Sequence, residues 1–430
     1  MSSDTDAATP LHVTPAVPGR SLLGSLLRSW PAAVGLGLLG AIVGACVFSL
    51  PFTLAPEPEA GLAVMGGARP VGPRYDHQNR GAPRLPPFWA ARAIDLSAID
   101  AAAVDAALRR EADRRLVEYT RLAESGFRPS DAQLRQAKPC YALGTDHLGR
   151  SVAPRVLVGG AISLAIGLSA AALSVLIGTV YGALAGYAGG AVDGVMMRVV
   201  DILYGLPYVL LVVLLAVAVD GALGRWQAAR VERVIAQTRL VAESEVASLP
   251  APQRTNAARA DALKRARATL GNGELSPAQA QGINLLTLLI AIGGVSWLTM
   301  ARVIRGQVLT LKAQPFMEGA RALGVPVARQ FVRHLLPNLI GPIVVYATLM
   351  VPQAILQESF LSFLGIGVRP PLPSWGNLAA DGLGELNQVR SHWWLLVFPC
   401  ALLALTLLSL NFVGEAVREA IDPRLSGRRA

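Results

Sequence analysis

Charged residues are scarce in this 430-residue chain, where Asp, Glu, Lys and Arg make up 16% and hydrophobic residues 53%. A soluble globular protein usually has about a quarter charged residues. Aromatic residues amount to 6%, too few for base stacking by a nucleic-acid-binding protein, despite the net charge of +10. The three cysteines have no spacing typical of a metal site or a disulfide framework. The composition favours a membrane protein that binds no nucleic acid.

Lysine is scarcer still, and its scarcity excludes one source of energy. None of the three lysines, Lys138, Lys264 and Lys312, follows a glycine. The phosphate-binding loop of many ATPases ends in Gly-Lys-Ser/Thr, so this chain does not carry that loop. No histidine falls in an apolar run, so Ser169 within one lacks the base that a serine nucleophile needs. We expect no catalytic residue, no metal site and no cofactor bound by this chain.

Long apolar runs are abundant. Six are long enough to cross a hydrocarbon core of roughly 30 Å at about 1.5 Å per helical residue. The first run covers 32–53. The second and third, 156–181 and 195–219, lie within the segment 151–220. The last three, 283–303, 339–360 and 394–413, lie within the segment 283–415. A cleaved signal peptide, the alternative for the first run, would have a shorter apolar region of about 7–15 residues. The expected fold is an all-α membrane protein with six transmembrane helices.

Two long polar inserts, 54–150 and 221–282, separate these runs and show mostly helical periodicity, strongest over 100–127. Arginines in short loops orient a membrane protein, because positive residues stay in the cytoplasm. They are dense in the connection 305–338 and in the tail 416–430, whereas the loop before the sixth run has only Arg369 and Arg390. We therefore expect both tails, 1–31 and 416–430, in the cytoplasm, and both inserts outside.

The connection contains a compact basic segment, EGARALGVPVARQFVRHLLPN (318–338). One apolar stripe at helical spacing comprises Ala320, Leu323, Val327, Phe331 and Leu335. Gly324 is suited to a left-handed cap that ends a first helix, and Pro326 to the first turn of a second. Pro337 is expected to end the second helix before the fifth run. An amphipathic helix on the lipid surface is the alternative, but a fixed corner favours docking into a groove on a partner protein.

This segment resembles the EAA loop of ABC importer permeases, through Glu318-Gly319-Ala320, Gly324 and the Leu336-Pro337 end. Four further motifs are similar to the C-type subunit of the dipeptide, oligopeptide and nickel permease family: LGTDHLGRS (143–151), GYAGGAVDGVMMRVVDILYGLP (186–207), QESFLSFLGIGVRPPLPSWGNL (357–378) and GEAVREAIDPR (414–424). The resemblance covers 143–220 and 283–425 well. Gly319 replaces the usual alanine, and Ser151 replaces a common aspartate.

The resemblance implies a permease subunit of a peptide or related importer in a bacterial inner membrane. Its implied partners are a second permease, identical or different, two ATPase subunits that bind the ATP, and an extracytoplasmic solute-binding protein. The bent segment would then be the coupling helix that contacts an ATPase. The coupling residues would be Glu318, Gly319, Ala320, Arg321, Gly324, Pro326, Arg329, Arg333, Leu336 and Pro337.

Several alternatives stay open at this stage. A self-contained secondary transporter would use ionisable residues within the spans, for which Asp201, Glu358 and Glu415 are candidates near span ends. Glu358 is the strongest candidate for a pore contact with a substrate amine. Trp393 and Trp394 are expected to anchor the sixth run at the outer interface. The inserts are either a docking platform for the binding protein or an addition of this lineage, and the solute is open.

Overall fold

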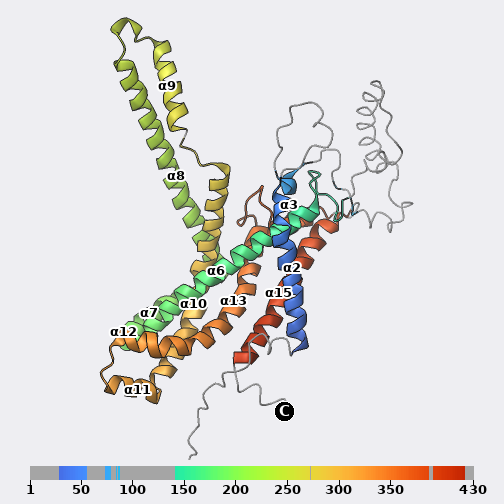
Figure 1. Cartoon of the computed structure of the whole chain (residues 1–430), viewed down its shortest axis with the longest axis vertical. Helices are drawn as coiled ribbons and strands as arrows, with labels where there is room; N and C mark the ends of the chain where they lie inside the picture. The colour runs from blue at the N-terminus through green and yellow to red at the C-terminus, as the bar shows by residue number, and fades with distance from the viewer. Residues whose placement is uncertain are drawn as a thin grey trace, which may run out of the picture.

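The computed structural model describes residues 29–55, 73–78, 84, 86–87, 141–271, 273–386 and 391–421. Within these ranges six helices are long and apolar enough to cross a membrane. They lie together as an elongated bundle (Figure 1). The predicted all-α membrane fold with six spans is confirmed. The helix predicted over 100–127, the tail 1–28 and residues 422–430 lie outside the described residues.

Five spans follow the predicted apolar runs but extend beyond them. The first comprises α2 (Trp30–Phe48) and α3 (Leu50–Leu54), the second α6 (Val152–Ala188), the fourth α10 (Pro277–Lys312), the fifth α13 (Leu336–Phe363) and the sixth α15 (Trp394–Ile421). These helices continue past the apolar runs, because helical hydrogen bonding does not stop where the apolar composition stops.

The third span differs from the prediction of one helix over 195–219. It is broken into α7 (Gly190–Tyr204) and α8 (Tyr208–Ala247). The break falls at Gly205–Pro207, where Pro207 has no N–H to donate and disfavours a helical conformation at Leu206. The apolar run thus contains a helix end and a helix start that hydropathy alone does not reveal.

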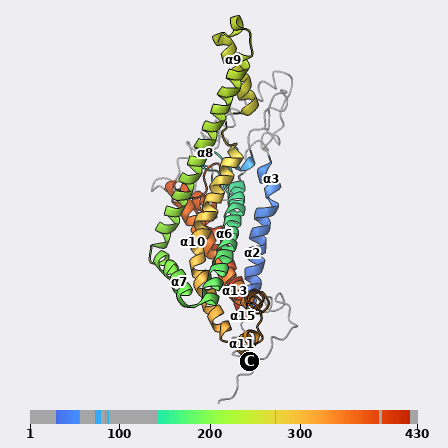
Figure 2. The same ribbon diagram turned by 90° about the vertical axis from the view of Figure 1, so that its left-hand side faces the viewer.

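Beyond the span, α8 continues without a break into the second insert. The chain turns at a short 3₁₀ helix (Ala251–Gln253) and returns as α9 (Asn256–Leu270). Ala242, Val246, Ala262 and Ala266 form a small apolar seam between the two helices. The insert is thus interrupted at 248–253, where Pro250 and Pro252 disfavour a continuous helix. The resulting hairpin extends far from the bundle (Figures 1 and 2).

The core of the bundle is the close contact between α6 and α10. Gly178, Gly182 and Gly186 recur every four residues on α6, and therefore lie on one face. A Cβ at Gly182 would collide with the backbone of Ala301, and one at Gly186 would lie 2.9 Å from the carbonyl oxygen of Arg305. Small residues of this kind allow membrane helices to approach closely. α6 and α10 thus form the scaffold on which two short helices sit at opposite ends, α11 (Pro315–Ala322) and α14 (Trp375–Gly384).

Candidate functional site

The predicted corner in the basic segment is present at the end of α11. Gly324 has φ +69°. The N–H of Val325 donates to the carbonyl of Ala320 at 3.1 Å, and that of Gly324 to Arg321 at 2.9 Å. These two bonds are the Schellman arrangement, in which a left-handed residue satisfies the last carbonyls of a helix. The left-handed cap predicted at Gly324 is confirmed, and Pro326 is the N-cap of the next helix, α12 (Val327–Gln330).

The predicted helix end at Pro337 is wrong. The chain passes from α12 through a π-helical turn (Phe331–Leu335) directly into α13, so Val327–Phe363 is one continuous helical stretch. A π turn shifts the hydrogen-bond register by one residue, and Pro337 stands in the first turn of α13, where its missing N–H is tolerated. The corner therefore joins α11 to a helix that is rigidly continuous with the fifth span.

Gln330 holds this corner in place, and no motif or spacing in the sequence indicates this role. Its side chain is 4% exposed. The amide nitrogen donates to the carbonyl of Val325 at 2.6 Å, and the amide oxygen accepts from the Tyr187 hydroxyl at 3.2 Å. Lys312 in turn donates to the carbonyl of Tyr187 at 2.6 Å. Gln330 thus ties the turn after α11 to the end of α6, a pairing of residues far apart in the chain.

The predicted polar contact residues all lie on the outside of this module. Glu318, Arg321, Arg329 and Arg333 are exposed, and Arg321 donates to the carbonyl of Lys312 at 3.1 Å. Leu336 and Pro337 are exposed too, and a Cβ at Gly319 would meet no atom within 4 Å. The structure therefore brings these side chains to one end of the molecule without engaging most of them.

The single apolar stripe predicted for this segment is wrong. Ala320 and Leu335 are buried, but Leu323 is 83% exposed and Val327 58%. The corner at Gly324 changes the direction of the chain, so helical spacing counted across it does not keep residues on one face. The buried anchor of α11 is instead Met317, which is fully enclosed. The exposed surface at this end combines apolar and charged side chains, and we call it the α11 surface. It consists of Leu323, Val327, Glu318, Arg321, Arg329 and Arg333.

The opposite end, around α14, carries the other predicted candidate. Glu358 is fully buried, and its carboxylate accepts from the hydroxyls of Ser362 at 2.7 Å and Ser359 at 3.3 Å. The hydroxyls of Ser163 and Ser374 also bond to it. This differs from the expectation that Glu358 faces a pore. The carboxylate is enclosed within the subunit, where it joins α13 to α6 and to the N-cap of α14.

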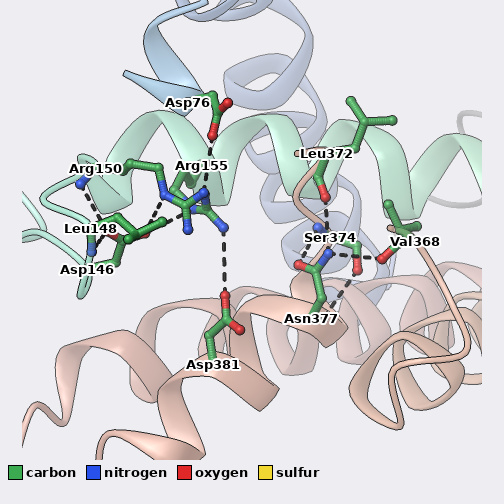
Figure 3. Close-up of polar contacts among 10 residues, drawn as sticks. All are labelled: Asp76, Asp146, Leu148, Arg150, Arg155, Val368, Leu372, Ser374, Asn377 and Asp381. Carbon is green, nitrogen blue, oxygen red and sulfur yellow. Dashed lines mark hydrogen bonds and ion pairs between the residues drawn. The ribbon is translucent and has the colours of Figure 1, made fainter. Parts of the chain in front are cut away.

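Further polar contacts fix α14 to its surroundings (Figure 3). Ser374 and Asn377 form a capping box at its start, and the Asn377 amide also donates to the carbonyls of Val368 and Leu372. The buried Arg155 of α6 lies 3.7 Å from Asp381 on α14 and 3.7 Å from Asp146. α14 is therefore held to α6 and to the preceding loop at several points.

Trp394 belongs to this end and corrects another expectation. It is 4% exposed, and its indole N–H donates to the carbonyl of Thr145 at 3.3 Å. It is therefore a packing residue within the protein and not an anchor at a lipid interface.

Just beyond α14, Arg84 and Glu385 form a bidentate pair with distances of 2.7 and 2.8 Å. The hydrogen bonds from Arg84 lower the pKa of the Glu385 carboxyl.

This fold and this site define a multi-pass membrane protein. Its polar groups at the α14 end bond to one another, whereas its α11 end presents a bent helix with mostly unengaged side chains. Comparison with known proteins places it more narrowly. Residues 174–427 match the family model described as binding-protein-dependent transport system inner membrane component. The chain belongs to this family.

Relatives agree with this assignment. The chain is 35% identical over 302 residues to the oligopeptide transport system permease protein OppC of Haemophilus influenzae, covering 69% of this chain and 76% of that protein. It is 36% identical to the dipeptide transport system permease protein DppC of Bacillus subtilis (66% of this chain, 68% of that protein). It is 38% identical to the OppC protein of Escherichia coli K12 (66% and 72%).

Proposed function

We propose that this chain is one transmembrane subunit of an ATP-driven importer of peptides or related small solutes. The single observation that carries the proposal is the α11 surface, a firmly anchored corner with unengaged apolar and charged side chains. The names of the relatives, oligopeptide and dipeptide transport permeases, support the substrate class. Because the sequence lacks a phosphate-binding loop, the energy comes from outside this chain, in this proposal from a separate ATPase.

In this proposal the α11 end faces the cytoplasm, as the arginines of 305–338 favour. Two ATPase subunits each receive one bent helix, this chain supplying one and a second permease the other. An extracytoplasmic protein delivers the solute at the α14 end. Closure of the ATPases moves α11, and the continuous Val327–Phe363 helix transmits that displacement to the membrane. Glu318, Arg321, Arg329 and Arg333 contact the ATPase, and Gly324 sets the corner.

The test is uptake of a labelled tripeptide by vesicles that contain this chain co-expressed with the second permease, the ATPases and the binding protein. We expect uptake to require ATP. Uptake by this chain alone on an imposed proton gradient would instead establish the secondary-transporter alternative.

Two glycines of the same module make a matched pair for this assay. Gly324→Pro cannot adopt the left-handed φ of +69°, and should reduce both ATPase association and uptake about tenfold or more. Gly319→Ala, in open space within α11, should leave both intact. Unchanged association in Gly324→Pro would refute the coupling role.

A further inference from the structure

The broken third span runs beside α10, and a series of side-chain contacts shows their alignment. Asp193 on α7 pairs with Arg305 at 2.6 Å, and Asp201 pairs with Arg302 at 2.9 Å. The Tyr208 hydroxyl lies 2.9 Å from that of Ser296. As the residue number rises on α7 and α8 it falls on α10, so the break at Gly205–Pro207 lies between the levels of Arg302 and Ser296. Six residues of helix, about 9 Å, separate these two levels.

The break therefore lies at membrane depth, within the apolar stretch 283–303 of α10. Residues 204–210 around it are exposed on this subunit. Lipid cannot hydrogen-bond the peptide groups that a broken helix leaves open, so such a break occurs only where protein or water covers it. This face of the subunit is thus turned away from lipid.

Polar side chains follow the same face along its length. The contacts from one end to the other are Asp193 with Arg305, Asp201 with Arg302, Tyr208 with Ser296, Ser296 with Gln357, and Asp220 with Arg369. Most are well exposed, including Asp201 at 57% and Arg369 at 61% of the side chain. Charged and polar groups in a membrane span face a protein interior or a water-filled path. Charged pairs at the two ends of this face, with the Tyr208, Ser296 and Gln357 group between them, favour a path.

A hollow of about 360 Å³ opens on this face beside Tyr208. Val209 and Val212 of α8 line it, opposite Leu356 and Phe360 of α13. Gln357 adds one polar group, whose amide oxygen accepts from Ser296 at 3.2 Å. Among the described residues its amide nitrogen has no acceptor. An apolar hollow with a single oriented donor is typical of a site that binds a small ligand by shape and one hydrogen bond.

We propose that the α7–α8 face lines the path of the solute and that this hollow receives an apolar side chain of a passing peptide. The Gln357 amide nitrogen donates to a peptide carbonyl at the hollow's edge. The inference rests on the proposed import function and names the part of the subunit that contacts the substrate. Lipid or the second permease could instead cover this face, and the test below distinguishes both from the solute path.

Cysteine labelling in the assembled transporter tests the water-filled path. Cys46, Cys140 and Cys400 are first replaced, and one cysteine is introduced at Leu356 or, as the matched control, at Leu408. Both leucines are about half exposed, 52% and 48%, but Leu408 is on α15, on the other side of the bundle (Figure 1). A membrane-impermeant thiol reagent should modify Leu356→Cys about tenfold faster, because only a hydrated thiol ionises readily.

The tripeptide Ala-Phe-Ala, at saturation, should slow the modification of Leu356→Cys and leave any reaction at Leu408→Cys unchanged. If Leu356→Cys is as unreactive as the control, lipid or the second permease covers the hollow and the inference is wrong. If it reacts but the peptide has no effect, the hollow does not bind the solute and the inference is again wrong.

Filling the hollow gives an independent transport readout. Leu356→Trp should raise the KM for Ala-Phe-Ala about tenfold, because a large side chain no longer fits, and leave the KM for Ala-Gly-Ala nearly unchanged. Leu408→Trp should change neither. Equal effects on both peptides would overturn the inference. ATP-dependent uptake by the unaltered transporter, measured in the same vesicles, separates this failure from failure of the proposed function.

Discussion

At the α14 end buried polar groups bind one another, whereas at the α11 end most polar groups point outward. Glu358 bonds to four serine hydroxyls inside the subunit, and Asn377 bonds to three backbone groups of the loop before its helix. At α11, by contrast, Glu318, Arg329 and Arg333 are exposed. A polar group removed from water must find a partner, and at the α14 end most buried groups do, although the Arg155 guanidinium only approaches its carboxylate partners, at 3.7 Å. The α11 end is anchored mainly through Met317 and Gln330 and leaves most of its charged surface exposed.

The largest effect is expected where the α14 end is most self-contained. Glu358→Ala would leave a cavity and remove the acceptor of several buried hydroxyls, so we expect the free energy of unfolding to fall by about 3 kcal/mol. Glu358→Gln, which keeps the volume and one oxygen acceptor, should recover more than half of this loss. Thermal unfolding of the purified protein in detergent measures both. Equal stability of Glu358→Ala and the unaltered protein would show that the serine cluster does not fix this end.

A smaller and more local effect is expected at the α11 end. Gln330→Leu removes the bonds to Val325 and Tyr187, each worth about 1 kcal/mol, and loosens the corner while the bundle stays folded. ATPase association should weaken about tenfold, the factor to which about 1.4 kcal/mol corresponds. Tyr187→Phe removes only one of the bonds and should give an intermediate effect. Tight association in Gln330→Leu would contradict the role of Gln330 as an anchor.

The Arg84–Glu385 pair at the α14 end predicts that the stability of the fold depends modestly on pH. The pKa of Glu385 is lowered by Arg84 from its ordinary value of 4.5, so the stabilisation is complete above that value and is lost as the pH falls through the lowered pKa. Arg84 is 46% exposed, and solvent screening limits the effect to about 0.5–1 kcal/mol. Glu385→Gln should reduce the difference in melting temperature between about pH 6 and about pH 3.5. An unaltered difference would mean that the pair contributes nothing.

The smallest effect concerns Gly319, which replaces the alanine usual in the resembled motif. Gly319→Ala should stabilise α11 by up to about 1 kcal/mol, since alanine favours helix and the added Cβ meets open space. Gly324→Ala, placed at φ +69°, should destabilise the same helix by about 1 kcal/mol. Hydrogen exchange of the α11 amides measures both. Faster exchange in Gly319→Ala would show that the glycine is required there.

The six spans and the corner at Gly324 were predictable because each depends on local sequence. Apolar runs define spans, and glycine takes a left-handed cap at little cost. The break at Gly205–Pro207 was also encoded locally, by a proline within an apolar run, but hydropathy averages over it. Pro337 shows the opposite case, a proline that does not break a helix. It stands in the first turn of α13, directly after the π turn, and the helix continues through it.

Other features depend on contacts between distant segments. Gln330 meets Tyr187 only because α6 ends beside α12, and no spacing in the sequence indicates that pairing. Glu358 is enclosed because Ser163 and Ser374 come to it from other parts of the chain. The exposure of Leu323 likewise follows from the direction that the chain takes after Gly324. In each case the packing of helices decides the environment of the side chain.

Co-purification of the ATPase with two variants tests the central claim most directly. Leu323 in the α11 turn is 83% exposed and Leu383 on α14 is 51% exposed, so aspartate at either position should leave the fold intact. The account predicts that Leu323→Asp loses the ATPase when the complex is isolated from membranes, whereas Leu383→Asp retains it. Retention by Leu323→Asp together with loss from Leu383→Asp would contradict the assignment of the α11 surface as the docking site.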